Sequence, residues 1–80
     1  MQETGTDRLR AAIVRRGRVE GTLLKVDDFL NHRVDPDLIV GVGDSLAERF
    51  AAAAPDVVLT AEASGIAPAL TCALRLRLPM

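Results

Sequence analysis

The chain has 80 residues and a formal net charge of −1, with 49% hydrophobic and 26% charged residues. This composition is typical of a globular protein and excludes a disordered polar chain. The small net charge gives no general attraction to nucleic acid or to an anionic membrane, so neither is expected as a partner. No apolar run approaches the roughly 18 residues of a membrane-spanning helix, and the first residues lack the order of a signal peptide, which predicts a cytoplasmic protein.

The first third of the chain predicts a helix followed by an extended segment. The helix runs to about Arg16, with Thr6 or Asp7 as its cap and Gly17 at its end. Five arginines gather on it and just after it, which indicates a solvated helix face, with an RNA-binding or partner-binding patch as the alternative. Residues 18–26 mix β-branched and aliphatic side chains and favour an extended conformation.

The clearest predicted element is a helix that begins after Asp35. Asp35 is a favourable cap, and Pro36 takes the first helical position, where its missing N–H costs nothing. An apolar stripe at helical spacing continues to Phe50. Gly41-Val42-Gly43 falls inside this helix, follows no strand and lacks the third glycine of a dinucleotide-binding loop, so we do not interpret it as one.

The last third predicts a buried strand, a tight loop and another helix. Val57-Val58-Leu59 is a short, continuous apolar run of the kind found in central parallel strands. A loop of small residues and a helix over residues 66–74 follow, and the single cysteine, Cys72, is expected to be buried and structural. Residues 76–80 begin what we predict to be another strand. Because a strand buried on both faces needs neighbours on both sides, we expect these residues to be a truncated domain and inactive alone.

Two stretches have the composition of binding sites. The loop Glu62-Ala63-Ser64-Gly65 lies between the predicted strand and helix, where small residues allow close approach of a ligand and amides at a helix start favour an anion. An ordinary structural turn is the alternative, since such turns are commonly small and polar. The second stretch, residues 23–32, combines an aliphatic pair with Phe29 and Asn31. Its apolar groups could cover the faces of a planar heteroaromatic ring while the amide pairs with the ring edge.

Other polar groups in the second stretch carry weaker signals. The single histidine, His32, is more typical of a surface or capping residue than of a catalyst. With one histidine and one cysteine in the chain, a metal site built from soft ligands is not expected. Asp27 and Asp28 are adjacent and normally point apart, which favours a loop or cap role over a catalytic pair.

Together the two stretches resemble the bacterial xanthine phosphoribosyltransferases, which belong to the type I purine phosphoribosyltransferases. The resemblance extends from about residue 23 to residue 79, with the same order and similar spacing. The first stretch is specific to that family, whereas the second is shared by purine phosphoribosyltransferases in general. The residues that carry it are Leu24-Lys25-Val26-Asp27-x-Phe29-Leu30-Asn31-His32 with the following Asp35-Pro36, and Glu62-x-Ser64-Gly65-Ile66-Ala67-Pro68-Ala69.

The resemblance implies an α/β fold of the type I phosphoribosyltransferase kind. In that fold, helices flank a twisted, mainly parallel sheet, and a hood covers the base; the hood would occupy about 18–34 and the start of the core about 35–80. The implied enzyme joins xanthine to 5-phosphoribosyl 1-diphosphate in purine salvage, giving xanthosine 5′-monophosphate and diphosphate. Magnesium would be carried with the ribose diphosphate, and the complete protein would be a homodimer.

The resemblance also implies roles for particular residues. Leu24 and Asn31 would contact the xanthine, and the backbone of Ala63, Ser64 and Gly65 would hold the diphosphate. A strained or cis peptide between non-proline residues is expected within residues 62–65, with Ala63–Ser64 as the favoured bond. Catalysis would rest on positioning and on stabilising the departing diphosphate, with no catalytic side chain and no protein metal ligand named.

The chain departs from the family pattern in a few places, and other readings stay open. Asp28 and Ala63 each replace a serine that is usual in the family, and the acidic pair and glycine-rich turn that bind the ribose 5-phosphate are not among the 80 residues. An adenine or guanine/hypoxanthine phosphoribosyltransferase would share the small loop without the first stretch. A transcription regulator of this fold should begin with a winged-helix segment. An inactive fragment is the remaining alternative.

Overall fold

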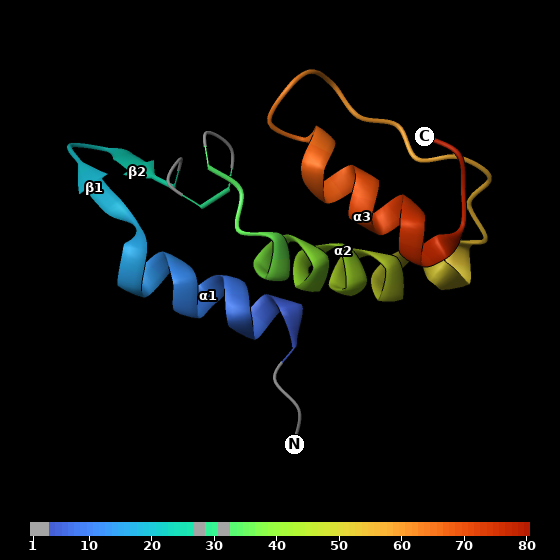
Figure 1. Ribbon diagram of the computed structural model, residues 1–80, viewed down its shortest axis with the longest axis horizontal. Coiled ribbons are helices and arrows are strands. Elements are labelled where there is room, and N and C mark those ends of the chain that lie inside the picture. Colours follow the sequence, from blue (N-terminus) through green and yellow to red (C-terminus); the bar gives the residue numbers. More distant parts are fainter. Residues whose placement is uncertain (1–3, 27–28, 31–32) are drawn as a thin grey trace.

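The computed structural model describes residues 4–26, 29–30 and 33–80. Figure 1 shows a long central helix between two others, with a small hairpin at one end of the molecule. This mixture of helix and strand is consistent with the predicted α/β class. The elements, in chain order, are α1 (Gly5–Arg16), β1 (Arg18–Glu20), β2 (Leu23–Lys25), α2 (Pro36–Phe50), the 3-10 helix η1 (Ala51–Ala53) and α3 (Ile66–Leu76).

Helix α1 begins earlier than the sequence predicted. Thr4 is its N-cap: the Thr4 hydroxyl accepts from the Asp7 N–H at 3.0 Å, and the Asp7 carboxylate accepts from the Thr4 N–H at 3.2 Å. This reciprocal capping box requires the acidic residue at the third helical position, so the prediction of Thr6 or Asp7 as the cap is wrong. Gly17 ends the helix as predicted, in an extended conformation, and its N–H donates to the Ile13 carbonyl.

The extended segment predicted after α1 is a hairpin. β1 and β2 pair antiparallel, with Arg18 opposite Lys25 and Glu20 opposite Leu23. The turn between them places Gly21 at φ +60°, in the left-handed region that glycine adopts without a steric penalty. An ion pair of 3.1 Å joins Lys25 to Glu20 across the two strands.

Helix α2 is packed closely on both sides, and two glycines make this possible. In a helix, positions two apart point in directions about 200° apart, so Gly41 and Gly43 face opposite neighbours. A Cβ on Gly43 would lie 2.6 Å from the Thr71 Cβ and 2.7 Å from the Thr71 carbonyl carbon in α3. A Cβ on Gly41 would lie 2.9 Å from the end of the Arg8 side chain and 3.3 Å from the Gly5 Cα, both in α1. The Gly-Val-Gly sequence is therefore a packing feature.

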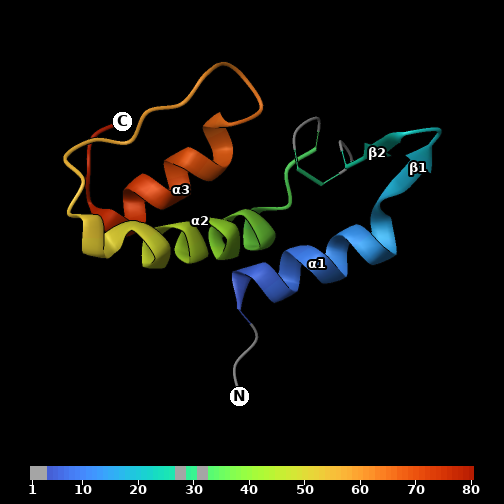
Figure 2. The same ribbon diagram turned by 180° about the vertical axis from the view of Figure 1, so that it is seen from behind.

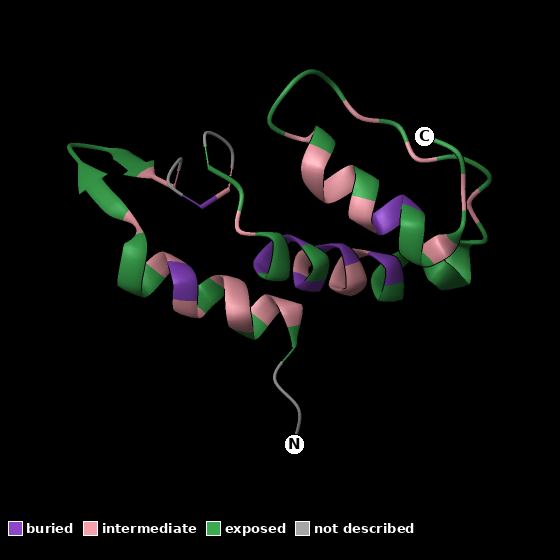
Figure 3. Ribbon diagram, viewed as in Figure 1, coloured by how far each residue is buried: buried purple, intermediate pink, exposed green. Residues whose placement is uncertain are grey.

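The buried residues lie where α2 meets its two neighbours, as Figure 3 shows. Between α1 and α2, the buried cluster consists of Ala12, Phe29 and Leu38. On the α3 side, Thr71 donates from its hydroxyl to the Ile39 carbonyl of α2 at 3.0 Å. Cys72 is buried in α3, as predicted. None of the helices in the described ranges is both long enough and apolar enough to cross a membrane.

The two predicted parallel strands are not formed in the described part of the chain. Residues 56–60 have no strand conformation, and Val57 and Leu59 are 54% and 91% exposed. The last predicted strand is also wrong at its start, because α3 continues to Leu76 and Arg77 caps it at φ +58°.

One backbone hydrogen bond joins these two segments, from the Val58 N–H to the Pro79 carbonyl at 2.9 Å. A central strand requires neighbours on both sides to satisfy its backbone groups. Within the described residues, that single bond is the pairing that the 56–60 segment makes with another segment. An open apolar groove of about 420 Å³ lies beside it, lined by residues that include Leu46, Phe50, Val57, Val58, Leu59, Pro68, Cys72 and Leu76.

We expect Gly43→Ala to destabilise the whole protein by about 1–3 kcal/mol, because the new methyl group would meet backbone of α3 that cannot move independently. Alanine in an exposed helix position would stabilise instead, by up to about 1 kcal/mol. Gly41→Ala is the comparison, and it should cost less because part of its clash is with the movable end of Arg8. Urea unfolding of the two variants measures the difference in the free energy of unfolding. Equal destabilisation would contradict the close contact described between Gly43 of α2 and the backbone of α3.

Candidate functional site

The loop at residues 62–65 turns directly into α3. Gly65 is the N-cap of α3 and makes no side-chain cap, and the Ile66 N–H donates back to the Ala63 carbonyl at 3.1 Å. Among the described residues, the amides of Ala63, Ser64 and Gly65 donate to no backbone carbonyl. Three consecutive amides at the positive end of a helix dipole can bind an anion. The three residues predicted to hold the diphosphate therefore lie directly before the first turn of α3.

The peptide bond between Glu62 and Ala63 is cis. It lies within the predicted range, one bond before the favoured Ala63–Ser64. The expectation of a cis peptide in this loop is confirmed, and the choice of bond is wrong.

Gly65 is packed against the residue that precedes the loop. Its φ is −81°, a conformation open to any residue, so backbone freedom is not the reason for glycine here. A Cβ on Gly65 would lie 2.5 Å from the Thr60 Oγ1 and 3.7 Å from the Ala61 carbonyl oxygen. A side chain at this position would therefore crowd the loop itself.

An open cavity of about 280 Å³ adjoins the loop. It lies at the carboxyl end of the 57–60 segment, where open α/β proteins commonly bind ligands. Figures 1 and 2 show the loop rising on the side of α2 that faces away from α1. The cavity is lined by Val58, Leu59, Thr60, Glu62, Ile66 and Met80.

The second predicted stretch is only partly described. Leu24 lies in β2 opposite Val19, and half of its side chain is exposed, so its surface is available to a ligand. Asn31, the predicted partner of the purine edge, lies outside the described residues, as do His32 and the two adjacent aspartates, 27 and 28.

Phe29 does not have the exposed position that ring stacking on a ligand would require. Its side chain has no exposed area and packs with Ala12 and Leu38 in the core between α1 and α2. Burial of an aromatic side chain is worth about 1.5–3 kcal/mol, which favours the core over solvent. The expectation that this aromatic covers a bound ring is wrong in this structure.

Backbone hydrogen bonds fix the chain on both sides of Phe29. The N–H groups of Phe29 and Leu30 both donate to the Val26 carbonyl, at 3.2 Å and 3.0 Å. The Asp35 N–H donates to the Phe29 carbonyl at 3.1 Å, which closes the loop between these two residues. Phe29 therefore anchors the segment that follows β2 to the helices α1 and α2.

Two arginines of α1 bind the start of α2, a role that sequence reasoning missed. The Arg8 guanidinium donates to the Asp37 carbonyl at 2.7 Å. The Arg16 guanidinium donates to the Asp35 carboxylate at 3.1 Å, and its central carbon lies 4.9 Å from the centre of the Phe29 ring. The Arg16 side chain is still 43% exposed, so the predicted solvated face holds there alongside these contacts. The available signal was the helical spacing of Arg16 from the apolar residues Leu9, Ala12 and Ile13.

Metal-binding side chains do not gather in the described part of the chain. No group of three or more histidine, cysteine, aspartate or glutamate side chains lies there in a position to hold a metal ion.

Curated relatives of the chain are bacterial enzymes named xanthine phosphoribosyltransferase. No protein-family model matches the chain. The chain is 53% identical over 62 residues to the enzyme of Chloroflexus aurantiacus, which is 78% of the chain and 29% of that protein. It is 52% identical over 73 residues to that of Heliobacterium modesticaldum and 51% identical over 73 residues to that of Moorella thermoacetica, in both cases over 90% of the chain.

These relatives are much longer than the chain. It spans 39% of the Heliobacterium protein and 37% of the Moorella protein. A match over 90% of the chain spans both predicted binding stretches, since they lie well inside its two ends. The comparison confirms the resemblance on which the predicted site residues depend.

We expect acid to weaken the capping of α2 through Asp35. The hydrogen bond from the Leu38 N–H, with smaller contributions from Arg16, holds the pKa of Asp35 below its ordinary 3.8, against the opposing effect of desolvation. Because the pKa is lower in the folded state, the ionised carboxylate stabilises the fold above about pH 3.8, and this is lost as the pH falls through the folded pKa.

Asp35→Asn tests this expectation, because asparagine caps helices as well as aspartate but does not ionise. Stability measured between about pH 7 and about pH 3 should fall less steeply in the variant than in the wild type. Parallel curves would show that Asp35 does not carry the effect.

Proposed function

We propose, from the similarity of this chain to bacterial xanthine phosphoribosyltransferases, that the whole protein is a purine salvage glycosyltransferase. It would convert xanthine and 5-phosphoribosyl 1-diphosphate to xanthosine 5′-monophosphate and diphosphate. The observation that carries the proposal is an identity of about 50% over 90% of the chain to two bacterial enzymes of this name. The loop before α3 supports it, because the amides of Ala63, Ser64 and Gly65 donate to no backbone carbonyl among the described residues and the reaction needs an anion site of this kind.

The loop would serve the departing diphosphate. In the transfer, the bond from the anomeric carbon to the diphosphate oxygen breaks, a bond to a purine ring nitrogen forms, and the purine releases one ring N–H proton. Positive charge develops on the ribose while the diphosphate gains negative charge. The amides of Ala63, Ser64 and Gly65 would stabilise that leaving group, and fixed donors of this kind need no reorganisation during the reaction. The replacement of a serine by Ala63 leaves the amide unchanged.

The diphosphate would arrive with magnesium, which neutralises part of its charge. Magnesium commonly keeps several waters and binds substrate phosphates with few protein ligands, so no residue of this chain is assigned to it. The Glu62 carboxylate is negatively charged, as is the diphosphate, so the two would repel each other. We therefore assign Glu62 to supporting the conformation of the loop.

The hood would serve the purine. Leu24, with its half-exposed side chain on the hairpin, would contact the ring. Asn31 would pair with the ring edge through its amide, which offers both a donor and an acceptor. In this assignment residues 18–34 form the hood and residues 35–80 begin the core.

We also propose that the whole protein has the type I phosphoribosyltransferase fold. The bond between Val58 and Pro79 would then be the first of a parallel sheet, and the exposed side chains of Val57 and Leu59 would be covered by that sheet and its helices. A homodimer in the cytoplasm is part of the same expectation.

The base preference can be tested by assaying the whole protein with xanthine, guanine, hypoxanthine and adenine in the presence of the ribose diphosphate. We expect xanthosine monophosphate to form with the highest kcat/KM. A higher kcat/KM with another purine would instead assign the protein to the phosphoribosyltransferases of that purine.

The role of Asn31 can be tested with Asn31→Ala. This variant should lower kcat/KM for xanthine roughly 5- to 150-fold, which corresponds to about 1–3 kcal/mol, because a polar group of the purine is left unpaired. The KM for the ribose diphosphate is the internal control. Unchanged xanthine kinetics would remove Asn31 from the site.

The diphosphate loop can be tested at Gly65. We expect Gly65→Ala to raise the KM for the ribose diphosphate by about 10- to 100-fold, because a small displacement of the amides misplaces the anion. Since the new methyl group would meet the Thr60 hydroxyl, the double variant Gly65→Ala/Thr60→Ala should recover most of the affinity. An unaltered KM in the single variant would refute the anion cradle. No recovery in the double variant would instead indicate that the methyl group meets the ligand directly.

A further inference from the structure

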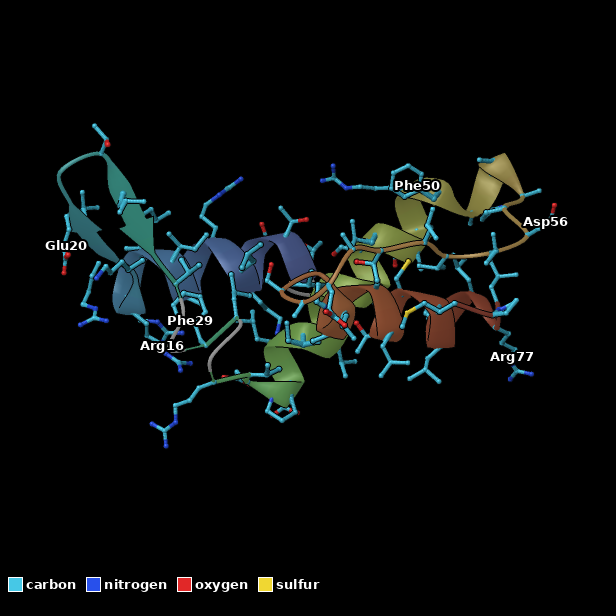
Figure 4. All side chains as sticks on the ribbon, turned by 90° about the horizontal axis from the view of Figure 1, so that it is seen from above. Arg16, Glu20, Phe29, Phe50, Asp56 and Arg77 are labelled. Atoms are coloured by element: carbon cyan, nitrogen blue, oxygen red, sulfur yellow. The ribbon has the colours of Figure 1, made fainter. Side chains whose placement is uncertain are left out.

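The Arg16 guanidinium contacts both ends of one loop. It lies over the Phe29 ring at 4.9 Å from the ring centre and donates to the Asp35 carboxylate at 3.1 Å. Figure 4 shows Arg16 and Phe29 together beneath the hairpin end of the molecule. The Asp35 N–H also bonds to the Phe29 carbonyl, so these two residues form the closed neck of the loop, and Arg16 is bound across that neck.

This double contact suits the chemistry of arginine. A guanidinium is planar, so it can stack on a ring through its face while its edge donates hydrogen bonds to a carboxylate. The ring below it is completely buried, and the carboxylate beside it is the cap of α2. Because the ion pair is partly exposed, it contributes little stability by itself. What the arrangement fixes is the position of the neck relative to both α1 and α2.

The neck is joined to the hairpin by a short stretch of backbone. The Val26 carbonyl accepts from the N–H groups of Phe29 and Leu30, and Val26 directly follows β2. Leu24 is therefore separated from the anchored ring by one hydrogen-bonded turn. Asn31 is two residues beyond Phe29 in the sequence. Both residues assigned to the purine thus belong to the segment whose anchor Arg16 holds.

We propose that Arg16 is a positioning residue for the purine: by holding Phe29 and Asp35 together, it sets the place of the hood over the base. This inference rests on the proposed function. The proposed diphosphate loop lies at the start of α3, on the opposite side of α2 from α1, the helix that carries Arg16. Arg16 should therefore affect binding of the purine and leave binding of the ribose diphosphate and the chemical step unchanged.

Steady-state kinetics of the whole protein provide the first test. Arg16→Gln should raise the KM for xanthine by about 3- to 10-fold, while kcat and the KM for the ribose diphosphate change by less than about twofold. Arg16→Lys keeps a cation over the ring but loses the planar fork, so it should recover part of the loss. Arg15→Gln, at the neighbouring exposed arginine, is the matched control and should resemble the wild type. A parallel loss in both KM values, in kcat and in stability would mean that Arg16 is only structural and would overturn the proposal.

Hydrogen exchange at the neck gives a readout that does not depend on activity. Protection of the Leu30 and Asp35 amides should fall by about 3- to 10-fold in Arg16→Gln, with no change in Arg15→Gln or in the amides of α3. Unchanged protection would overturn the proposal, as would lower protection with an unaltered KM for xanthine. A wild-type protein that forms no nucleotide from any purine would refute the proposed function, and the exchange data would still report whether Arg16 holds the neck.

Discussion

The close approach of α2 to both of its neighbours is the constraint on which the rest of the structure depends. Gly41 lets α1 reach the backbone of α2 on one side, and Gly43 lets α3 reach it on the other. A larger residue at Gly43 would separate two helices whose contact includes the bond from Thr71 to Ile39. Because Phe29 is buried between α1 and α2 and the loop at residues 62–65 leads into α3, both candidate binding stretches take their positions from this one helix.

The two candidate binding regions are built on different physical principles. In the proposed assignment, the loop at residues 62–65 would bind its ligand through backbone amides, so its function would depend on the direction of the chain before α3 and would tolerate an alanine at residue 63. The segment after β2 would act through side chains, and its position depends on Phe29 in the core and on the Arg16 guanidinium over the Phe29 ring.

The absence of a parallel strand in the described residues follows from the nature of sheets. A helix satisfies its own backbone, so the hydrogen bonds within α2 and α3 need no distant segment. A central strand must bond to segments distant in the chain, and among the described residues the 56–60 segment has one such bond, to Pro79. The apolar run of Val57 to Leu59 remains suited to a buried strand, yet here its outer side chains face solvent. An apolar pattern indicates which side chains favour burial. Whether they are buried depends on the segments that pack against them.

The features that depend on neighbouring residues could be predicted from the amino-acid sequence. The sequence located α2 through Asp35 and Pro36, the end of α1 at Gly17 and the loop of small residues before α3, because caps and turns are set by residues only a few positions apart. Two short stretches also indicated the resemblance that the curated relatives support. The tertiary structure alone decided that Phe29 is buried, that Arg16 binds across the neck of the hood loop, and that the two glycines of α2 are contact points. These outcomes depend on which distant segments come into contact on folding. A local pattern of residue types does not indicate which distant residue will be the partner.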